Sequence, residues 1–102
     1  MNPVIAVFRR WDDGGILALF PEYPADPFGR FCESYMHVGQ HAAADYHGVV
    51  QRTSPAKPSE YVELAIELTR IGYEVRPVMR ASSRHHERRR SEARRFRSTD
   101  TR

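Results

Sequence analysis

Two short apolar segments open the chain, and a polar stretch with two glycines separates them. Residues 4–10 and 16–20 are rich in β-branched, aromatic and aliphatic side chains, which is typical of β-strands. Residues 12–15 (DDGG) lie between them, and Asp and Gly suit a tight turn, so the pattern predicts a β-hairpin. Because apolar side chains occupy consecutive positions in both segments, we expect both faces of the sheet to be covered.

A proline-rich stretch follows the second predicted strand. Pro21, Pro24 and Pro27 recur at every third position, and Gly29 ends the stretch. Proline fixes φ and removes an amide donor, so the spacing predicts a stiff surface loop and not a central strand. The loop either only connects two strands or forms a wall beside a site.

The middle of the chain predicts one more strand and then a polar turn. Residues 30–36 have strand composition with alternating side chains. The sequence GQHAAADY then favours one or two helical turns, with Gly39 and Gly48 as the boundaries. Residues 49–53 are expected to form a short further strand.

Residues 58–71 give the strongest helix signal of the sequence. Pro58 suits the first helical position, Glu60 complements the positive helix end, and Gly72 suits a left-handed C-cap. Apolar residues recur at three- and four-residue spacing: Tyr61, Leu64, Ala65, Leu68 and Ile71. Residues 73–79 then alternate like a strand, and Pro77 places that strand at a sheet edge or a bulge.

These elements predict an α+β fold with a mainly antiparallel sheet of three to five strands. One long helix is expected to pack on one face of this sheet. A homo-oligomer would cover the other face, or the proline loop and the histidine-containing segment would do so. We expect residues 1–80 to form the compact domain, and residues 81–102, in which aliphatic side chains almost vanish, to form a flexible basic tail.

Composition places the chain among globular proteins of one domain. It has 102 residues, of which 40% are hydrophobic and 28% charged. No apolar run approaches the roughly 20 residues of a membrane helix, so no membrane partner is expected. Cys32 is the single cysteine, which excludes an internal disulfide and favours a cytoplasmic location.

The net charge of +3 is unevenly divided along the chain. Residues 1–80 contain eight Lys and Arg against ten Asp and Glu, a net charge of −2. Residues 81–102 contain eight Arg against three acidic residues, a net charge of +5. The basic character therefore belongs to the C-terminal segment.

Residues 30–47 contain three of the five histidines and are the first candidate site. A helical segment would place His37, His41 and Asp45 on one face, and with His47 they could bind a divalent metal ion. The HExxH arrangement of a zinc hydrolase is absent. The same stretch could instead form a pocket for a small molecule or nucleotide from Ser34, Tyr35, His37, Gln40, His41, Asp45 and Tyr46.

A third interpretation of these side chains is structural, because histidines and tyrosines often satisfy backbone groups and fix a loop to a sheet. No nucleophile motif is present: Cys32 lies in an apolar strand-like run, and Ser34 lacks a GxSxG elbow. We therefore predict no catalytic residue and no particular cofactor.

The C-terminal segment is the second candidate site. Its arginines resemble those of segments that fold on RNA or follow a phosphate backbone: Arg84, Arg88, Arg89, Arg90, Arg94, Arg95 and Arg97. A solvated extension with weak, salt-sensitive attraction for polyanions is the alternative. Three functions thus stay open: a non-enzymatic protein whose histidine and tyrosine segment binds a small molecule, nucleotide or protein partner; an accessory protein that binds RNA or DNA through the arginine-rich segment; and a metal-dependent enzyme.

Six segments span about residues 7–75: VFRRW, DDG, ILALFPE, PAD, GRFCESYMHVGQHAAADY and PAKPSEYVELAIELTRIGYEV. Together they resemble a family of small uncharacterised proteins of bacteriophages, plasmids and other bacterial mobile elements. Members commonly carry Thr before the helix proline, where this chain has Lys57. The resemblance implies a mobile-element context and no established activity, and the arginine-rich segment lies outside it.

Overall fold

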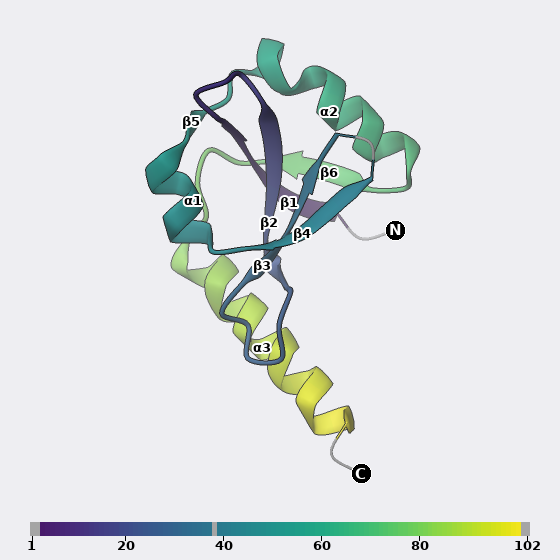
Figure 1. Ribbon diagram of the computed structural model, residues 1–102. Helices are drawn as coiled ribbons and strands as arrows, with labels where there is room; N and C mark the ends of the chain where they lie inside the picture. The colour runs from purple at the N-terminus through teal and green to yellow at the C-terminus, as the bar shows by residue number, and fades with distance from the viewer. Residues whose placement is uncertain (1–2, 38, 101–102) are drawn as a thin grey trace.

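The computed structural model describes residues 3–37 and 39–100, and its elements are shown in Figure 1. In chain order they are β1 (Pro3–Arg10), β2 (Ile16–Pro24), β3 (Cys32–Met36), β4 (Gln40–Ala44), α1 (Tyr46–Arg52), β5 (Ser54–Pro55), α2 (Pro58–Arg70), β6 (Glu74–Pro77) and α3 (Ser83–Asp100). The fold is α+β, as predicted. In the described residues the sheet has six strands and is accompanied by three helices, so the expected single long helix is not confirmed.

The sheet is mainly antiparallel and has the strand order β4-β3-β2-β1-β5. The predicted DDGG hairpin joins β1 to β2, which pair with Val7 opposite Leu19, and Gly14 has the positive φ of 92° that this turn requires. β6 runs parallel to the first half of β1. Pro77 ends this edge strand, as the sequence predicted.

Three local predictions between residues 21 and 53 are wrong. β2 continues through Pro21 to Pro24, where a register shift against β3 accommodates the prolines. The stretch expected to be helical contains β4, because Gly39 (φ 74°) turns the chain back and Gln40–Ala44 pair with β3. The segment expected to be a strand lies mostly in α1. In Gln40–Ala44, pairing with β3 thus overrides the local helix propensity.

The two faces of the sheet are covered by different helices. On one face, Leu64 and Leu68 of α2 pack in a cluster with Phe8 and Phe20, and the Phe8 and Tyr61 rings stack at 4.2 Å. α2 begins at the predicted Pro58. On the opposite face, Tyr46 and Val49 of α1 pack in a cluster with Leu17, Leu19 and other apolar residues. The apolar positions on both faces are therefore covered within one chain, and the homo-oligomer stays a prediction.

A buried arginine fixes α1 against the sheet. Arg9 of β1 is 7% exposed, and its Nη2 donates to the carbonyls of Val50 (2.9 Å) and Thr53 (2.7 Å) at the end of α1. Its Nε donates to Oγ1 of Thr53 (2.9 Å). The guanidinium therefore satisfies carbonyl groups that a helix end leaves without partners.

The expected flexible C-terminal tail is not confirmed, because residues 83–100 form the 18-residue helix α3. Figure 1 shows α3 beside the long turn that follows β2 and extending beyond the sheet. Ala93 is 1% exposed and Arg89 is 5% exposed, so one side of α3 is buried. A Cβ atom on Gly29 would lie 3.1 Å from Cα of Arg90, and Gly29 has a φ of 71°, so this close approach requires glycine. The division of the chain near residue 80 stays a prediction.

No helix in the described residues is long and apolar enough to cross a membrane.

We predict that Ala93→Glu releases α3 from the sheet, because a carboxylate would be buried at a position that is 1% exposed. Hydrogen exchange measured by mass spectrometry should become at least tenfold faster over residues 84–97. Ser91→Glu, at an exposed position of the same helix, should leave the exchange as in the unchanged protein. Equal exchange rates in the two variants would contradict the docking of α3.

Candidate functional site

The three histidines of the first candidate segment face three different environments. His37 lies in the β3–β4 turn, with Nδ1 2.6 Å from Oε1 of Glu67 in α2. His41 lies on β4 opposite Tyr35, with ring centroids 4.8 Å apart. His47 lies on α1, 5.1 Å from the ring of His86 in α3. The structure therefore does not bring these histidines together.

The predicted metal ligands do not form a cluster. Asp45 is at the N-cap of α1 and is exposed, and its side chain makes no capping hydrogen bond. Within residues 3–37 and 39–100 there is no group of three or more His, Cys, Asp or Glu side chains that could hold a metal ion. The set of His37, His41, Asp45 and His47 rested on a helix that the structure replaces with β4, and it gains no geometric support.

Two residues of the predicted ligand pocket serve the fold. Ser34 is buried, and its Oγ donates to the carbonyl of Ala42 across the β3–β4 pair (2.8 Å). Tyr46 is buried, and its hydroxyl accepts a hydrogen bond from the amide of Ala81 (2.7 Å). These contacts match the structural interpretation of the segment. Gln40, by contrast, is exposed at the start of β4.

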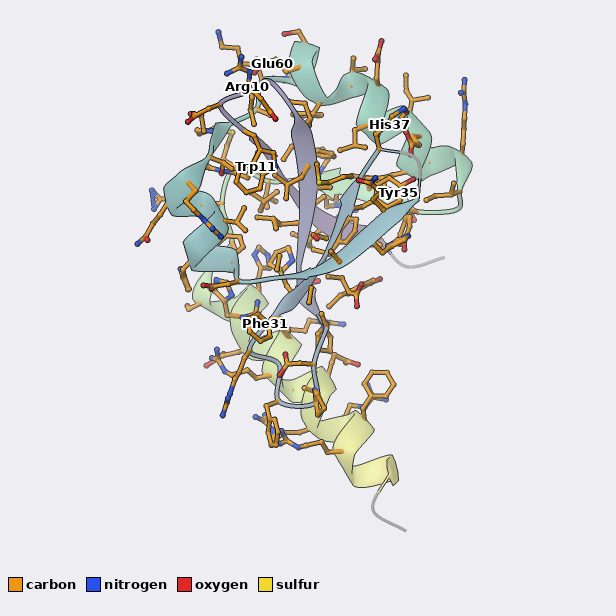
Figure 2. The ribbon with its side chains drawn as sticks, viewed as in Figure 1. Arg10, Trp11, Phe31, Tyr35, His37 and Glu60 are labelled. Atoms are coloured by element: carbon orange, nitrogen blue, oxygen red, sulfur yellow. The ribbon has the colours of Figure 1, made fainter. Side chains whose placement is uncertain are left out.

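Tyr35 and His37 share a carboxylate that the sequence did not reveal. The Tyr35 hydroxyl donates to Oε2 of Glu67 and accepts from the amide of Gly39 (2.8 Å), and Nδ1 of His37 faces Oε1 of Glu67. The hydrogen bond to Glu67 raises the pKa of Tyr35, with burial as the second cause. Figure 2 shows Tyr35 and His37 at the end of β3 that lies nearest α2.

A hollow of about 560 Å³ opens beside this Tyr35–Glu67–His37 group. Its described lining combines apolar, basic and acidic side chains: Ile16, His37, Glu60, Glu63, Leu64, Ile66, Glu67 and Arg70. Glu60 also pairs with Arg10 (3.1 Å), and both are labelled in Figure 2. Carboxylates predominate over cations here, which suits a cationic group better than a phosphate.

The arginines of α3 fall into an inward and an outward set. Arg89 and Arg97 point inward, since Arg89 is buried and Nη1 of Arg97 donates to the carbonyl of Pro27 (3.1 Å). The Arg97 guanidinium also lies 4.8 Å from the centre of the Phe28 ring. The outward set is exposed and consists, in the described residues, of Arg84, Arg88, Arg90, Arg94 and Arg95.

Arg89 holds α3 to the turn that follows β2. Its Nε donates to the carbonyl of Gly29 (2.8 Å), and its Nη1 donates to the carbonyl of Pro21 (2.7 Å). Nη1 also lies 2.8 Å from Nδ1 of His86. An arginine can only donate, so His86 Nδ1 accepts, and the neutral ring carries its proton on Nε2. Desolvation is the largest cause that lowers the pKa of His86 to about 4, and the neighbouring Arg89 and His47 contribute to the same shift.

Cys32 is not available as a nucleophile. Its side chain is fully buried in the apolar cluster beneath α1, as the sequence predicted. Burial raises the pKa of the thiol to about 11, so little thiolate forms near neutral pH.

Comparisons with known proteins add no relationship, since the chain matches no family model, no curated protein and no solved structure at a significant level. The resemblance to proteins of mobile elements therefore stays a prediction.

Sequence reasoning did not identify Glu67 or His86 as members of a site. Glu67 looked like an ordinary polar position of a helix, and it meets His37 across 30 positions of the chain. His86 was included in the basic segment without a role, and His47 approaches it only because α1 and α3 lie side by side. No local pattern marks either pair.

We predict that the free energy of unfolding decreases as the pH falls from about 6.5 to about 4, in part through His86. The folded protein holds the pKa of His86 near 4, while the unfolded value is 6.5. The unfolded chain therefore binds more protons in this interval, and acid favours unfolding. Urea denaturation at pH 7 and pH 4.5 measures the loss.

His86→Gln should reduce this loss, because Gln can still accept a hydrogen bond from Arg89 but does not titrate. His85→Gln, at the adjacent position, is the matched control and should retain the full loss. The prediction fails if both variants lose as much stability on acidification as the unchanged protein.

Proposed function

We propose that this protein binds nucleic acid through the outward face of α3. The observation that carries the proposal is the exposed set of arginines on a helix whose opposite side is docked on the sheet. Arginine suits this role because its guanidinium stays charged and can donate two parallel hydrogen bonds to a phosphate.

The spacing of the outward arginines suits a phosphate backbone. Arg84, Arg88 and Arg95 are four and then seven residues apart, so they follow one side of the helix. At 1.5 Å per residue they span about 16 Å, comparable to about five nucleotide steps of one DNA strand. Glu87 and Glu92 interrupt the face, and Glu92 pairs with Arg95 (3.1 Å).

The docking of α3 lowers the cost of binding. An arginine-rich segment that is disordered must lose conformational entropy when it folds on its target. Here Arg89, Ala93 and Arg97 already hold the helix against the turn after β2. The preceding part of the chain, residues 1–80, has a net charge of −2, so attraction for a polyanion is concentrated on α3.

We predict that replacing Arg84, Arg88 and Arg95 together with Gln lowers the affinity for nucleic acid about tenfold or more at 0.1 M salt. The plot of log K against log salt concentration should become less steep by about three for duplex DNA, because three phosphate contacts are lost. Fluorescence anisotropy with a 20-base-pair DNA and a 20-nucleotide RNA measures both quantities.

The matched control replaces Arg52, Arg70 and Arg76, which are exposed and lie outside α3, with Gln. This variant has the same net charge as the α3 variant and should retain most of the affinity. If the two variants lose affinity equally, net charge and not α3 accounts for binding. If the unchanged protein binds neither probe, the proposed function is wrong.

A second candidate function uses the hollow beside Tyr35, Glu67 and His37. Its acidic residues favour a small amine with an apolar part, which Ile16 and Ile66 would contact, over the nucleotide that the sequence also allowed. Ser34, Gln40, His41, Asp45 and Tyr46 of the predicted ligand set do not line this hollow.

For this second function, phenethylamine is a suitable probe in a titration followed by NMR chemical shifts. Shifts should saturate and concentrate in α2 and the β3–β4 turn, and Glu63→Gln should weaken binding several-fold because one lining carboxylate is lost. Glu74→Gln, an exposed carboxylate on β6, should not. Shifts that are scattered or equally affected by both variants would exclude this candidate.

A further inference from the structure

A second hollow, of about 460 Å³, lies where α1, α3 and the turn after β2 meet. Its volume is within the usual range of small-molecule sites. Gly29 is where that turn comes close to α3, since a Cβ atom on it would lie 3.1 Å from Cα of Arg90. The described residues that line the hollow are Phe28, Gly29, Arg30, His47, Ser83, His86, Arg89 and Arg90.

The charge of this lining is entirely positive. Among the described residues that line the hollow there are three arginines and no carboxylate. The hollow beside α2 has the opposite character. The nearby carboxylate of Asp26 favours the charged form of Arg89. This carboxylate already accepts hydrogen bonds from the backbone amides of Phe28 (3.1 Å) and Phe31 (2.7 Å). An anion in the hollow would therefore meet cations and hydrogen-bond donors.

The positive groups are held in place by other contacts. Arg89 is buried and fixed by the carbonyls of Gly29 and Pro21. The Arg30 guanidinium lies 5.5 Å from the centre of the Phe28 ring, while Arg90 is exposed on α3 next to Arg89. A fixed cation behind two exposed ones stabilises an anion more than mobile surface charges do, because little entropy is lost on binding.

His86 adds a neutral donor to this arrangement. His86 accepts a hydrogen bond from Arg89 at Nδ1 and consequently carries a proton at Nε2. Its ring lies against Tyr46 (4.9 Å) and His47 (5.1 Å). His47 and the hydroxyl of Ser83 also line the hollow. Several donors therefore surround a space from which carboxylates are absent in the described lining.

We propose that this hollow binds the phosphate of a phosphomonoester, with Arg30 and Arg90 contacting the phosphate oxygens. A monoester suits the site better than an internal phosphodiester, because it carries up to two negative charges and three terminal oxygens. The hollow exceeds the size of a phosphate and leaves space for the organic part. This site includes Arg90 of the outward set, but it differs from the face formed by Arg84, Arg88 and Arg95, since Arg30 comes from the turn after β2 and Arg89 is buried.

Two kinds of molecule carry a phosphomonoester: a free nucleotide, and a nucleic acid strand at its 5′-phosphate end. Adenosine 5′-monophosphate, adenosine and inorganic phosphate are the small probes for isothermal titration calorimetry on the full chain. The monophosphate should bind saturably, adenosine should not bind, and Arg30→Gln or Arg90→Gln should weaken binding about tenfold. Arg84→Gln, on the outward face, should leave the affinity unchanged.

A 12-nucleotide RNA with a 5′-phosphate and the same RNA with a 5′-hydroxyl separate the two sources. Tighter binding of the phosphorylated RNA, lost in Arg30→Gln, supports a strand end as the ligand. Equal binding of the two RNAs together with saturable binding of the monophosphate supports a free monoester.

The proposal is overturned if the unchanged protein binds neither the monophosphate nor phosphate saturably, or if Arg84→Gln weakens binding as much as Arg30→Gln. The experiment also distinguishes this site from the proposed function. The variant without Arg84, Arg88 and Arg95 should lose affinity for nucleic acid and still bind the monophosphate.

Discussion

The position of α3 depends on the hydrogen bonds that the buried Arg89 guanidinium donates. A buried charge is costly unless its donors are satisfied, and here the carbonyls of Pro21 and Gly29 and the ring of His86 accept from it. These acceptors belong to β2 (Pro21), to the turn after it (Gly29) and to α3 itself (His86), so the contact fixes the helix against the sheet. The outward arginines and the basic hollow both take their positions from this docking.

Arg9 plays the same part for α1, which it joins to β1 through the carbonyls of Val50 and Thr53. The seven-residue α1 and the arginine-rich α3 are thus both attached by arginine-to-carbonyl hydrogen bonds in addition to apolar packing. α2 is different, since Leu64 and Leu68 bury an aliphatic stripe against the sheet. The hollow beside α2 is lined mainly by acidic side chains and the hollow beside α3 by basic ones. The two hollows therefore favour ligands of opposite charge.

Local signals predicted the parts of the fold that depend on neighbours in sequence. The DDGG hairpin and the helix that begins at Pro58 follow from such signals. β4 could not be predicted, because its residues favour a helix locally and become a strand only by pairing with β3. α3 was not predicted because its composition resembles a disordered tail. The carbonyls that accept hydrogen bonds from Arg89 lie 60 and 68 positions earlier in the chain. The two hollows were predicted less well than the fold. Glu67 and His86 line them only because tertiary contacts bring distant parts of the chain together.

The most direct test of the account is the NMR signal of the Arg89 side chain in uniformly ¹⁵N-labelled protein. A guanidinium fixed between two backbone carbonyls should give a separate Nε–H resonance that exchanges slowly with water at pH 7, with nuclear Overhauser contacts to Gly29. A resonance that overlaps with those of the exposed arginines and exchanges rapidly would show that Arg89 is not held. The docked helix, and with it both proposed sites on α3, would then be contradicted.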